Sequence, residues 1–221
     1  MKELNKQGTC IIIGAGDLTV GSLPYNPEED YITAADGGLM YCGLLELEPD
    51  CIIGDFDSLD TSYAEALESI CKSCPEKVIT LPVEKDDTDM FAAVKKGLEL
   101  GYKSFRLYGA NGGRLEHTIA NIQLLAYLKE QEAVGYIMDG SGMLLLARNE
   151  TISFQEAMEG YVNIFAYTEK ARGVTIRGLK YELNEATLTN RVPLGISNEF
   201  VGAQSHITVE EGTLLIIVNW I

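Results

Sequence analysis

The sequence predicts an α/β domain with a parallel sheet, followed by a small antiparallel β-sandwich. Up to about residue 140, short apolar segments alternate with helical patterns, which is typical of a parallel sheet covered by helices on both faces. After Gly140, short β-rich segments follow one another between turn residues, and the sequence shows no long helical period. The glycine-containing turn at residues 139–142 therefore predicts two domains, residues 1–140 and residues 141–221.

The expected elements of both domains follow from these patterns. Apolar runs predict strands of the first domain at residues 9–14, 31–35, 51–54, 77–81, 105–108 and 136–139. Between them, helices are expected to begin near Gly38, Thr61, Thr88 and Arg114. Strands of the second domain are expected at residues 143–147, 151–154, 161–167, 173–177, 186–189, 206–209 and 213–218. The segment GISNEF, residues 195–200, is interpreted as a polar loop among these strands.

The composition excludes several classes of partner. Among the 221 residues, 33 are acidic and 17 are basic, which gives a net charge of −16. Nucleic acids and anionic membranes are bound mainly through Lys and Arg, so neither is an expected partner. The N-terminus is polar and no apolar run approaches the ~20 residues of a membrane span, which indicates a cytoplasmic protein. The negative charge would also repel a bare polyphosphate, so a nucleotide needs compensation from a metal ion, placed cations or backbone amides.

The cysteines do not form a disulfide or zinc pattern. Their number, five, is odd, and all five lie in the first third of the chain. Cys71 and Cys74 form a C-x-x-C pair, but no second pair stands at the spacing of a zinc site. Reduced thiols are therefore expected.

Five loops are expected at one edge of the sheet, of which four carry Asp and four carry a run of small or Gly residues. They are GAGD at 14–17, DGG at 36–38, GDFDS at 54–58, EKDDTD at 84–89 and GANGGRLEH at 109–117. Each follows a strand, and open parallel sheets bind ligands at the carboxyl ends of their strands. The loops therefore predict a single polar site, although the dinucleotide-binding and P-loop fingerprints are absent from the sequence.

Asp55 and Asp57 are the first candidates for binding a metal ion. Residues two apart on an extended segment point the same way, so both carboxylates can face one ion. Gly54 allows an unusual backbone angle where the strand ends, and hard oxygen ligands suit Mg²⁺. The alternative is a plain turn before the next helix, because Asp is common in turns.

A second acidic run, Asp86, Asp87 and Asp89, surrounds the expected start of a helix at Thr88. Asp87 or Thr88 could cap this helix, and acidic residues favour its N-terminus. Three acidic residues exceed what capping requires, and Asp86 and Asp89 would share a face if the first turn is helical. We therefore expect Asp89 to be a third metal carboxylate and Asp86 to bind the metal or a water in its shell.

Arg114, His117 and Asn121 are spaced to lie on one stripe of the next expected helix. A stripe facing the core would be apolar, whereas this one offers a cation, a titratable ring and an amide. Gly112 and Gly113 precede it and allow backbone N–H groups to approach a phosphate closely, while Arg114 can hold phosphate oxygens in a bidentate manner. A structural imidazole is the alternative for His117, and it has equal weight.

Shorter signals accompany these loops. Gly14 opens the loop after the first strand, and Asp36 and Gly37 fit either a ligand site or a plain turn with a helix start. In the second domain, Ser197 and Asn198 could bind a ligand or close a turn, and composition alone favours the turn.

Taken together, the motifs resemble those of thiamine pyrophosphokinases, in order from residue 11 almost to the C-terminus. They are ADGG (35–38), PDCIIGDFDSL (49–59), KDDTD (85–89), GGRLEHTxxN (112–121), GISNEF (195–200) and EEGTLLII (210–217). The most specific part is GDFDS followed by DDTD. One position departs from the pattern: the family often has Asp where this chain has Glu116, which keeps the charge and lengthens the side chain.

The resemblance implies a homodimeric enzyme that transfers diphosphate from ATP to thiamine with Mg²⁺. It implies ATP at the carboxyl edge of the sheet, and thiamine in a cleft between one subunit's α/β domain and the other subunit's β domain, near Ser197 and Asn198. The implied ATP-binding residues are Gly14, Asp36, Gly37, Gly112, Gly113, Arg114, His117 and Asn121. The implied metal ligands are Asp55, Asp57 and Asp89. The implied catalytic residues are Asp57, Asp86, Asp89 and Arg114, with Asp86 or Asp57 as the acceptor of the hydroxyl proton.

Two other functions would use the same acidic loops or the β domain. A Mg²⁺-dependent nucleotide phosphohydrolase would use the same acidic loops to activate water and would need no acceptor alcohol. A sensor that binds nucleotide or thiamine without turnover would use the β domain as its output module. Several convergent carboxylates argue against the sensor, because a pure binding protein has little use for them.

Overall fold

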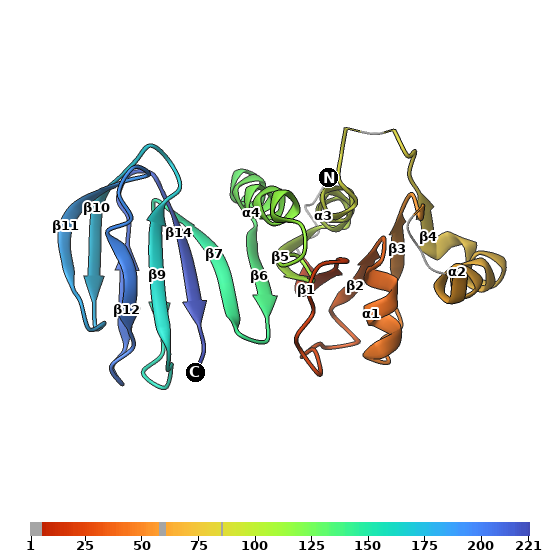
Figure 1. Ribbon diagram of the computed structural model, residues 1–221, viewed down its shortest axis with the longest axis horizontal. Helices are drawn as coiled ribbons and strands as arrows, with labels where there is room; N and C mark the ends of the chain where they lie inside the picture. Colours follow the sequence, from red (N-terminus) through yellow and green to blue (C-terminus); the bar gives the residue numbers. More distant parts are fainter. Residues whose placement is uncertain (1–5, 58–60, 85) are drawn as a thin grey trace. The chain divides into compact units, whose positions relative to one another are not determined.

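The chain folds into two units, Met1–Gly140 and Ser141–Ile221 (Figure 1). The first unit is built on a parallel sheet. The computed structural model describes residues 6–57, 61–84 and 86–221, so Ser58, Leu59 and Lys85 of the motifs above lie outside the described residues. In spatial order, the strands are β6 (Val134–Asp139), β5 (Tyr102–Tyr108), β1 (Lys6–Ile13), β2 (Tyr31–Ala35), β3 (Cys51–Gly54) and β4 (Val78–Thr80). Each neighbouring pair is parallel, so the carboxyl ends of all these strands lie at one edge.

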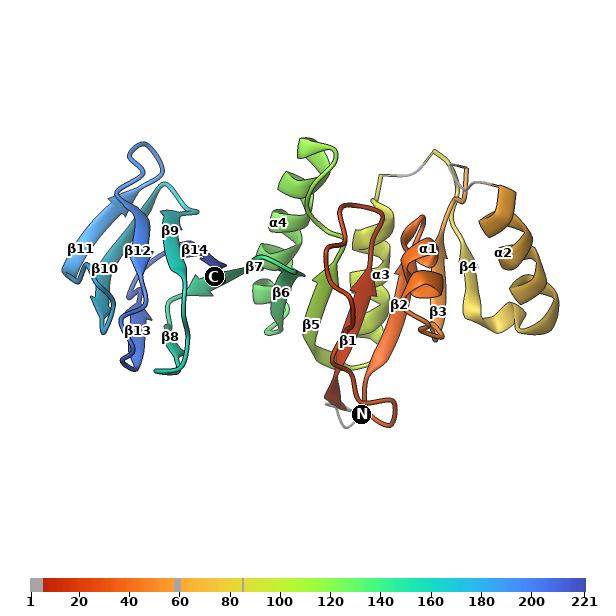
Figure 2. The same ribbon diagram turned by 60° about the horizontal axis from the view of Figure 1, so that its bottom comes forward.

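Helices cover both faces of this sheet (Figure 2). They are α1 (Gly38–Leu44), α2 (Thr61–Ser73), α3 (Asp89–Glu99) and α4 (Leu115–Glu130), with a short 3₁₀ helix η1 at Pro75–Lys77. Leu39 of α1 and Ile70 of α2 belong to one apolar cluster on one face. On the opposite face, α3 and α4 meet through the rings of Phe91 and Tyr127, whose centroids lie 4.8 Å apart. None of the helices in the described ranges is long and apolar enough to span a bilayer.

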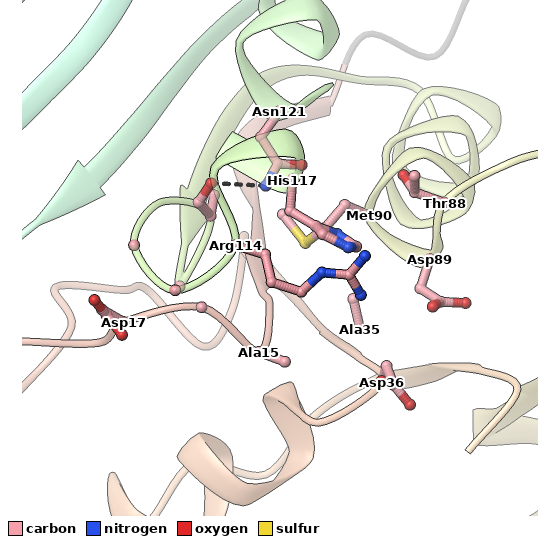
Figure 3. Close-up of a pocket in the computed structure, with 15 residues that line it drawn as sticks. Ala15, Asp17, Ala35, Asp36, Thr88, Asp89, Met90, Arg114, His117 and Asn121 are labelled. Carbon is pink, nitrogen blue, oxygen red and sulfur yellow. Dashed lines mark hydrogen bonds between the residues drawn. The ribbon is translucent and has the colours of Figure 1, made fainter. Parts of the chain in front are cut away.

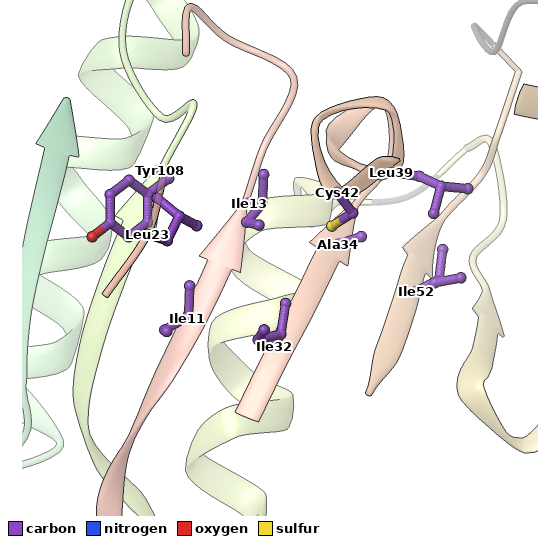
Figure 4. Close-up of a cluster of buried hydrophobic side chains, with 9 residues drawn as sticks. All are labelled: Ile11, Ile13, Leu23, Ile32, Ala34, Leu39, Cys42, Ile52 and Tyr108. Atoms are coloured by element: carbon purple, nitrogen blue, oxygen red, sulfur yellow. The ribbon is translucent and has the colours of Figure 1, made fainter. Parts of the chain in front are cut away.

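Buried side chains on both faces of the sheet fix the strands of the first unit in place. One cluster lies between the sheet and α1 and contains Ile11, Ile13, Leu23, Ile32, Ala34, Leu39, Cys42, Ile52 and Tyr108 (Figure 4). On the other face, a Cβ atom on Gly97 of α3 would lie 2.6 Å from the Phe105 ring and 2.7 Å from Cys10 Sγ, so glycine permits this close contact. Burying one Ile, Leu or Phe side chain stabilises a fold by about 1.5–3 kcal/mol. The loops at the carboxyl edge are therefore carried by a rigid support.

The described strands of the second unit form two antiparallel sheets, with the orders β12-β9-β14-β7 and β11-β10-β13-β8. They are β7 (Gly142–Arg148), β8 (Thr151–Phe154), β9 (Tyr161–Ala166), β10 (Lys170–Arg177), β11 (Leu183–Thr189), β12 (Gly195–Glu199), β13 (Ser205–Thr208) and β14 (Thr213–Asn219). Both sheets contribute buried side chains to the core, such as Ile164 and Ile176. The predicted fold class, a parallel α/β domain followed by an antiparallel β-sandwich, is confirmed.

One expectation for the second unit was wrong, because the segment GISNEF is not a loop. It forms β12, an edge strand paired with β9, with a register irregularity between Gly195 and Asn198. Ser197 has a φ of +60°, which interrupts the alternation of side chains along the strand. Polar residues on an exposed edge strand resemble a loop in composition, so the sequence pattern missed this strand.

Candidate functional site

A cavity of about 420 Å³ lies at the carboxyl edge of the parallel sheet (Figure 3). Small-molecule sites typically have volumes of about 300–1,000 Å³. Its walls come from the loops after β1 and β5, the end of β2, and the first turns of α3 and α4. The residues of the predicted site that line it are Asp36, Asp89, Gly112, Gly113, Arg114, His117 and Asn121.

The loops after β1 and β5 are joined by backbone hydrogen bonds. Gly14 N–H donates to Tyr108 O, Gly16 N–H to Gly109 O and Asp17 N–H to Asn111 O, each at 2.8 Å. Gly14 itself does not line the cavity. A Cβ atom there would lie 2.7 Å from Met90 Sδ and 2.8 Å from Gly109 O, so this glycine allows the two loops to pack closely.

Asp36 directly follows β2, lines the cavity and has a left-handed backbone. Its φ is +49°, a conformation that Asp adopts more readily than most residues. Its N–H donates to Ile53 O at 2.8 Å, which ties this strained residue to the neighbouring strand. Gly37, the next residue, is the N-cap of α1 and does not line the cavity.

The acidic residues at the start of α3, Asp86, Asp87 and Asp89, have different surroundings. Thr88 is the N-cap, and its hydroxyl oxygen accepts a backbone hydrogen bond of 3.1 Å in the first turn. Asp89 is the first helical residue and lines the cavity. Asp86 precedes the helix and is exposed, so the expectation that it shares a helical face with Asp89 was wrong. Asp87 forms an ion pair with Lys95.

Arg114, His117 and Asn121 all reach the cavity, although they do not share one helical stripe. Arg114 is the N-cap of α4, with φ −83° and ψ 117°, so its backbone is extended and the expected stripe holds only for the other two. Its side chain points toward the part of the cavity where Asp36 and Asp89 lie (Figure 3). Asn121 is 5% exposed, and its Nδ2 donates a 2.7 Å hydrogen bond to the carbonyl oxygen of residue 110.

Glu116 adds a contact that the sequence did not indicate. Its Oε1 accepts a hydrogen bond of 2.7 Å from Arg114 Nε. The pKa of the Glu116 carboxyl group is lowered, first by a hydrogen bond from its own backbone N–H and then by Arg114. The pair therefore joins an anionic side chain to the cation that we expect to hold phosphate oxygens.

Asp55 and Asp57 do not line the cavity, and the segment between them is not extended. Phe56 has a φ of +61°, which turns the chain between Asp55 and Asp57. Asp57 N–H donates to Asp55 Oδ1 at 3.4 Å across this turn. The premise that the two carboxylates point the same way along an extended segment was therefore wrong.

Oxygen ligands for a metal ion are present in the cavity in the form of Asp36 and Asp89. Within residues 6–57, 61–84 and 86–221, no group of three or more His, Cys, Asp or Glu side chains is arranged to hold a metal ion. Mg²⁺ commonly binds through one or two carboxylates together with substrate phosphates and waters. The two carboxylates therefore fit a magnesium ion that binds with a nucleotide, and Asp55, Asp57 and Asp89 as its ligands stay a prediction.

Asp17 is a candidate that the sequence analysis did not select. It lines the cavity on the loop after β1 (Figure 3). Its position at the end of the GAGD loop was the available signal. Of that loop, only Gly14 was a predicted site residue.

In the second unit, Asn198 and Ser197 differ in their accessibility. Asn198 is 6% exposed, and its amide bonds the backbone of Tyr181, with Oδ1 accepting from N–H at 2.9 Å and Nδ2 donating to O at 2.7 Å. Ser197 is exposed, and its N–H donates to Asn163 Oδ1 at 2.8 Å. The structure therefore gives Asn198 a role in holding β12, while the Ser197 side chain faces solvent.

Known proteins that match almost the whole chain are thiamine pyrophosphokinases. Two family models match, described as "Thiamin pyrophosphokinase, catalytic domain" at residues 24–137 and "Thiamin pyrophosphokinase, vitamin B1 binding domain" at residues 149–214. The chain is 27% identical to the thiamine pyrophosphokinase of Bacillus subtilis over 221 residues, which cover 98% of each chain.

Solved structures give the same result. A crystal structure of thiamine pyrophosphokinase from Bacillus subtilis matches with a TM-score of 0.86 and 25% identity, covering 96% of this chain and 99% of that one. A crystal structure of thiamin pyrophosphokinase from Geobacillus thermodenitrificans matches with a TM-score of 0.81 and 29% identity, covering 96% and 97%. The resemblance of the motifs is confirmed, and the chain belongs to the thiamine pyrophosphokinase family.

Proposed function

We propose that this chain transfers a diphosphate group from ATP to the hydroxyl group of thiamine and releases AMP. The observation that carries this proposal is the cavity at the carboxyl edge of the sheet, because it combines two of its three carboxylates with a cation and has a glycine pair in its wall. The carboxylates are those of Asp36 and Asp89, which would hold Mg²⁺ together with the phosphates. Bound Mg²⁺ would neutralise part of the triphosphate charge, which a chain with a net charge of −16 cannot offset by itself.

The protein groups that line the nucleotide cavity have distinct tasks. Arg114 can hold phosphate oxygens in a bidentate manner. Gly112 and Gly113 have φ angles of +79° and +59°, a backbone form that favours glycine and leaves the peptide groups open to a ligand. His117 and Asn121 line the same wall. This unit, Met1–Gly140, is in our proposal the catalytic one.

The reaction requires positioning more than covalent catalysis. The hydroxyl oxygen of thiamine forms a bond to the β-phosphorus of ATP, and the bond from this phosphorus to the oxygen that bridges to the α-phosphate breaks. The hydroxyl proton passes to a carboxylate, for which Asp57 and Asp86 are the sequence candidates. Neither lines the cavity, so the choice between them rests on the sequence alone.

We assign thiamine binding and dimerisation to the second unit. Ser197 is exposed on the edge strand β12, and apolar side chains on or beside this strand are exposed as well. They are Tyr181 (58%), Val192 (61%), Leu194 (62%), Ile196 (47%) and Val201 (54%). An edge strand flanked by apolar side chains favours association with another chain. This supports a homodimer, which we place in the cytoplasm.

One assay tests the reaction. The protein is incubated with ATP, Mg²⁺ and thiamine, and we expect AMP and thiamine diphosphate in equal amounts, with no product after chelation of the metal. Formation of ADP would indicate monophosphoryl transfer. Orthophosphate released without thiamine would indicate a phosphohydrolase, and nucleotide binding without any product would indicate a sensor. Each of these three results contradicts the proposal.

A further inference from the structure

Asp17 is exposed and lies at one end of the cavity, on a loop whose backbone is fixed. Its backbone N–H donates to Asn111 O, and the N–H of Gly16 donates to Gly109 O, both at 2.8 Å, so the loop that carries it is fixed on the loop after β5. A Cβ atom on Gly112 would lie 2.1 Å from Asp17 Oδ2. The carboxylate therefore occupies space beside Gly112 that any larger residue would fill.

The charges of the cavity differ from one end to the other. Asp36 and Asp89 lie on the side toward which Arg114 points, whereas Asp17 lies at the opposite end (Figure 3). The Asp17 side chain makes no ion pair or hydrogen bond within the described part of the chain. An unpaired carboxylate repels phosphate groups, so the phosphates of a bound nucleotide belong at the end with Arg114.

The uncharged nucleoside then occupies the end with Asp17. An ionised carboxylate only accepts hydrogen bonds, so it needs donors on the ligand. The neighbouring 2′ and 3′ hydroxyl groups of ribose offer two donors that can meet the two oxygens of one carboxylate. Acidic residues bind ribose hydroxyl groups in this way in other nucleotide-binding α/β folds. The adenine amino group, by contrast, lies at the far end of the base from the phosphates and can meet one oxygen.

From this placement, we infer that Asp17 accepts hydrogen bonds from the ribose hydroxyl groups of the nucleotide and selects ribonucleotides over deoxyribonucleotides. The inference rests on the proposed function, because it takes ATP as the occupant of the cavity. It adds a specificity residue on the loop after β1. The phosphates stay with Arg114 and the carboxylates at the other end.

Equilibrium binding in the absence of thiamine tests this inference. The protein with Mg²⁺ is titrated calorimetrically with ATP, 2′-deoxyATP, 3′-deoxyATP and ITP. We expect the wild-type protein to bind ATP about tenfold or more tightly than either deoxynucleotide, because a hydrogen bond to a charged group is lost. Asp17→Ala loses both hydrogen bonds, so it is expected to weaken ATP binding by at least the same factor and to bind ATP and both deoxynucleotides equally. Asp17→Asn keeps the size of the side chain, removes its charge and is expected to lose most of the preference.

A matched control separates this local effect from net charge. Glu99 is exposed on α3 outside the cavity, and Glu99→Ala removes the same single negative charge. This variant is expected to keep the wild-type preference for ATP over the deoxynucleotides. If Glu99→Ala also lost that preference, net charge rather than Asp17 would be its cause and the inference would be overturned.

Each of the remaining outcomes either supports or overturns the role of Asp17 in binding ribose. Equal binding of ATP and deoxynucleotides by the wild-type protein, or a preference that Asp17→Ala retains, would overturn the inference. The inference would also be overturned if Asp17→Ala lost only the discrimination between ATP and ITP, because that result would place Asp17 at the base. Sugar selectivity without formation of thiamine diphosphate would support Asp17 and contradict only the proposed reaction. If no nucleotide bound to the wild-type protein, both the proposed reaction and the role of Asp17 would be contradicted.

Discussion

Glu116 accepts a hydrogen bond of 2.7 Å at Oε1 from Nε of Arg114, which lines the candidate ATP site. The contact uses Nε and leaves the two terminal nitrogens of the guanidinium group for phosphate oxygens. Both side chains are largely exposed, 73% and 64%, so water screens their attraction. Glu116 is therefore expected to orient Arg114 rather than to bind the nucleotide.

Substitution of Arg114 should raise the KM for ATP much more than substitution of Glu116. Arg114→Ala loses a charge-assisted contact with phosphate, worth about 1.5–3 kcal/mol, and should raise the KM for ATP by about tenfold or more. Glu116→Gln should raise it by less than about fivefold, because an exposed ion pair contributes little. Steady-state kinetics with ATP and thiamine varied separately measure both effects, and Glu116→Asp serves as the conservative control. Unchanged ATP use together with lost thiamine binding in Arg114→Ala would place Arg114 on the other substrate.

Asp89 and Asp87 provide a matched pair for testing the metal assignment. Of the two, Asp89 lines the cavity, whereas Asp87 pairs with Lys95. Asp89→Asn should reduce kcat by roughly 100-fold or more, as loss of charge stabilisation at one point can do, while Asp87→Asn should keep most of the rate. Titration of the rate with Mg²⁺ measures the change. Equal rates for both variants would contradict a metal role for Asp89.

Asp57 requires its own experiment, because the structure does not bring it to the cavity. If Asp57 binds the metal once the nucleotide is present, Asp57→Asn should also reduce kcat by roughly 100-fold. The measurement is again the rate as a function of Mg²⁺ concentration. Turnover near the wild-type rate would remove Asp57 from the metal site and leave Asp36 and Asp89 as its protein ligands.

Asn121 should act mainly through the loop that it holds. Its Nδ2 donates to the buried carbonyl oxygen of Ala110, so Asn121→Ala leaves that oxygen without its donor. We expect the free energy of unfolding to fall by about 1–3 kcal/mol and the KM for ATP to rise with it. Asn121→Asp keeps the size and also lacks the donor, so its stability should change in the same direction. Denaturant unfolding measures this, and weaker ATP binding at unchanged stability would show direct contact instead.

The sequence predicted those features that have a local signal. The apolar runs at residues 31–35 and 51–54 coincide with β2 and β3, and Thr88 caps α3 as one of the two expected candidates. Each depends on neighbours within one turn or one strand, which is why the pattern alone was sufficient.

Other features depend on single backbone angles or on distant contacts. Phe56 and Ser197 have φ angles of +61° and +60°, and neither residue type signals this in the sequence. These angles turned the Asp55–Asp57 segment away from an extended form and put a bulge into β12. The place of Asp17 depends on Gly112, which lies on another loop far along the chain. No local pattern contains that contact.

The buried cysteines should be unreactive in the folded protein. Cys42 is 1% exposed, and burial raises the pKa of its thiol to about 12 from 9.0. The thiolate, which is the reactive form, is thus nearly absent until the pH approaches that value. At pH near 8, iodoacetamide should modify the exposed Cys71 and leave Cys42 intact. Mass spectrometry measures the labelling, and denatured protein, in which all cysteines react, is the control.

The shared thiamine site can be tested by mixing two inactive variants. Asp89→Asn removes a carboxylate of the ATP cavity. Ser197→Trp enlarges an exposed side chain at the bulge of β12, so it should block thiamine without disturbing a buried core. If each site is formed by the first unit of one chain and the second unit of the other, a mixed dimer has one site with both changes and one site with neither.

Mixing should therefore restore activity that neither variant has alone. Under random exchange about half of the dimers are mixed, and each has one intact site of two, so the ceiling is roughly a quarter of wild-type activity. The measurement is thiamine diphosphate formation before and after exchange, with exchange itself followed by differently labelled chains. Mixing each variant with more of itself is the control and should restore nothing. If labelled chains exchanged and activity stayed absent, or if sedimentation showed a monomer, each site would be complete within one chain and the shared arrangement would be excluded.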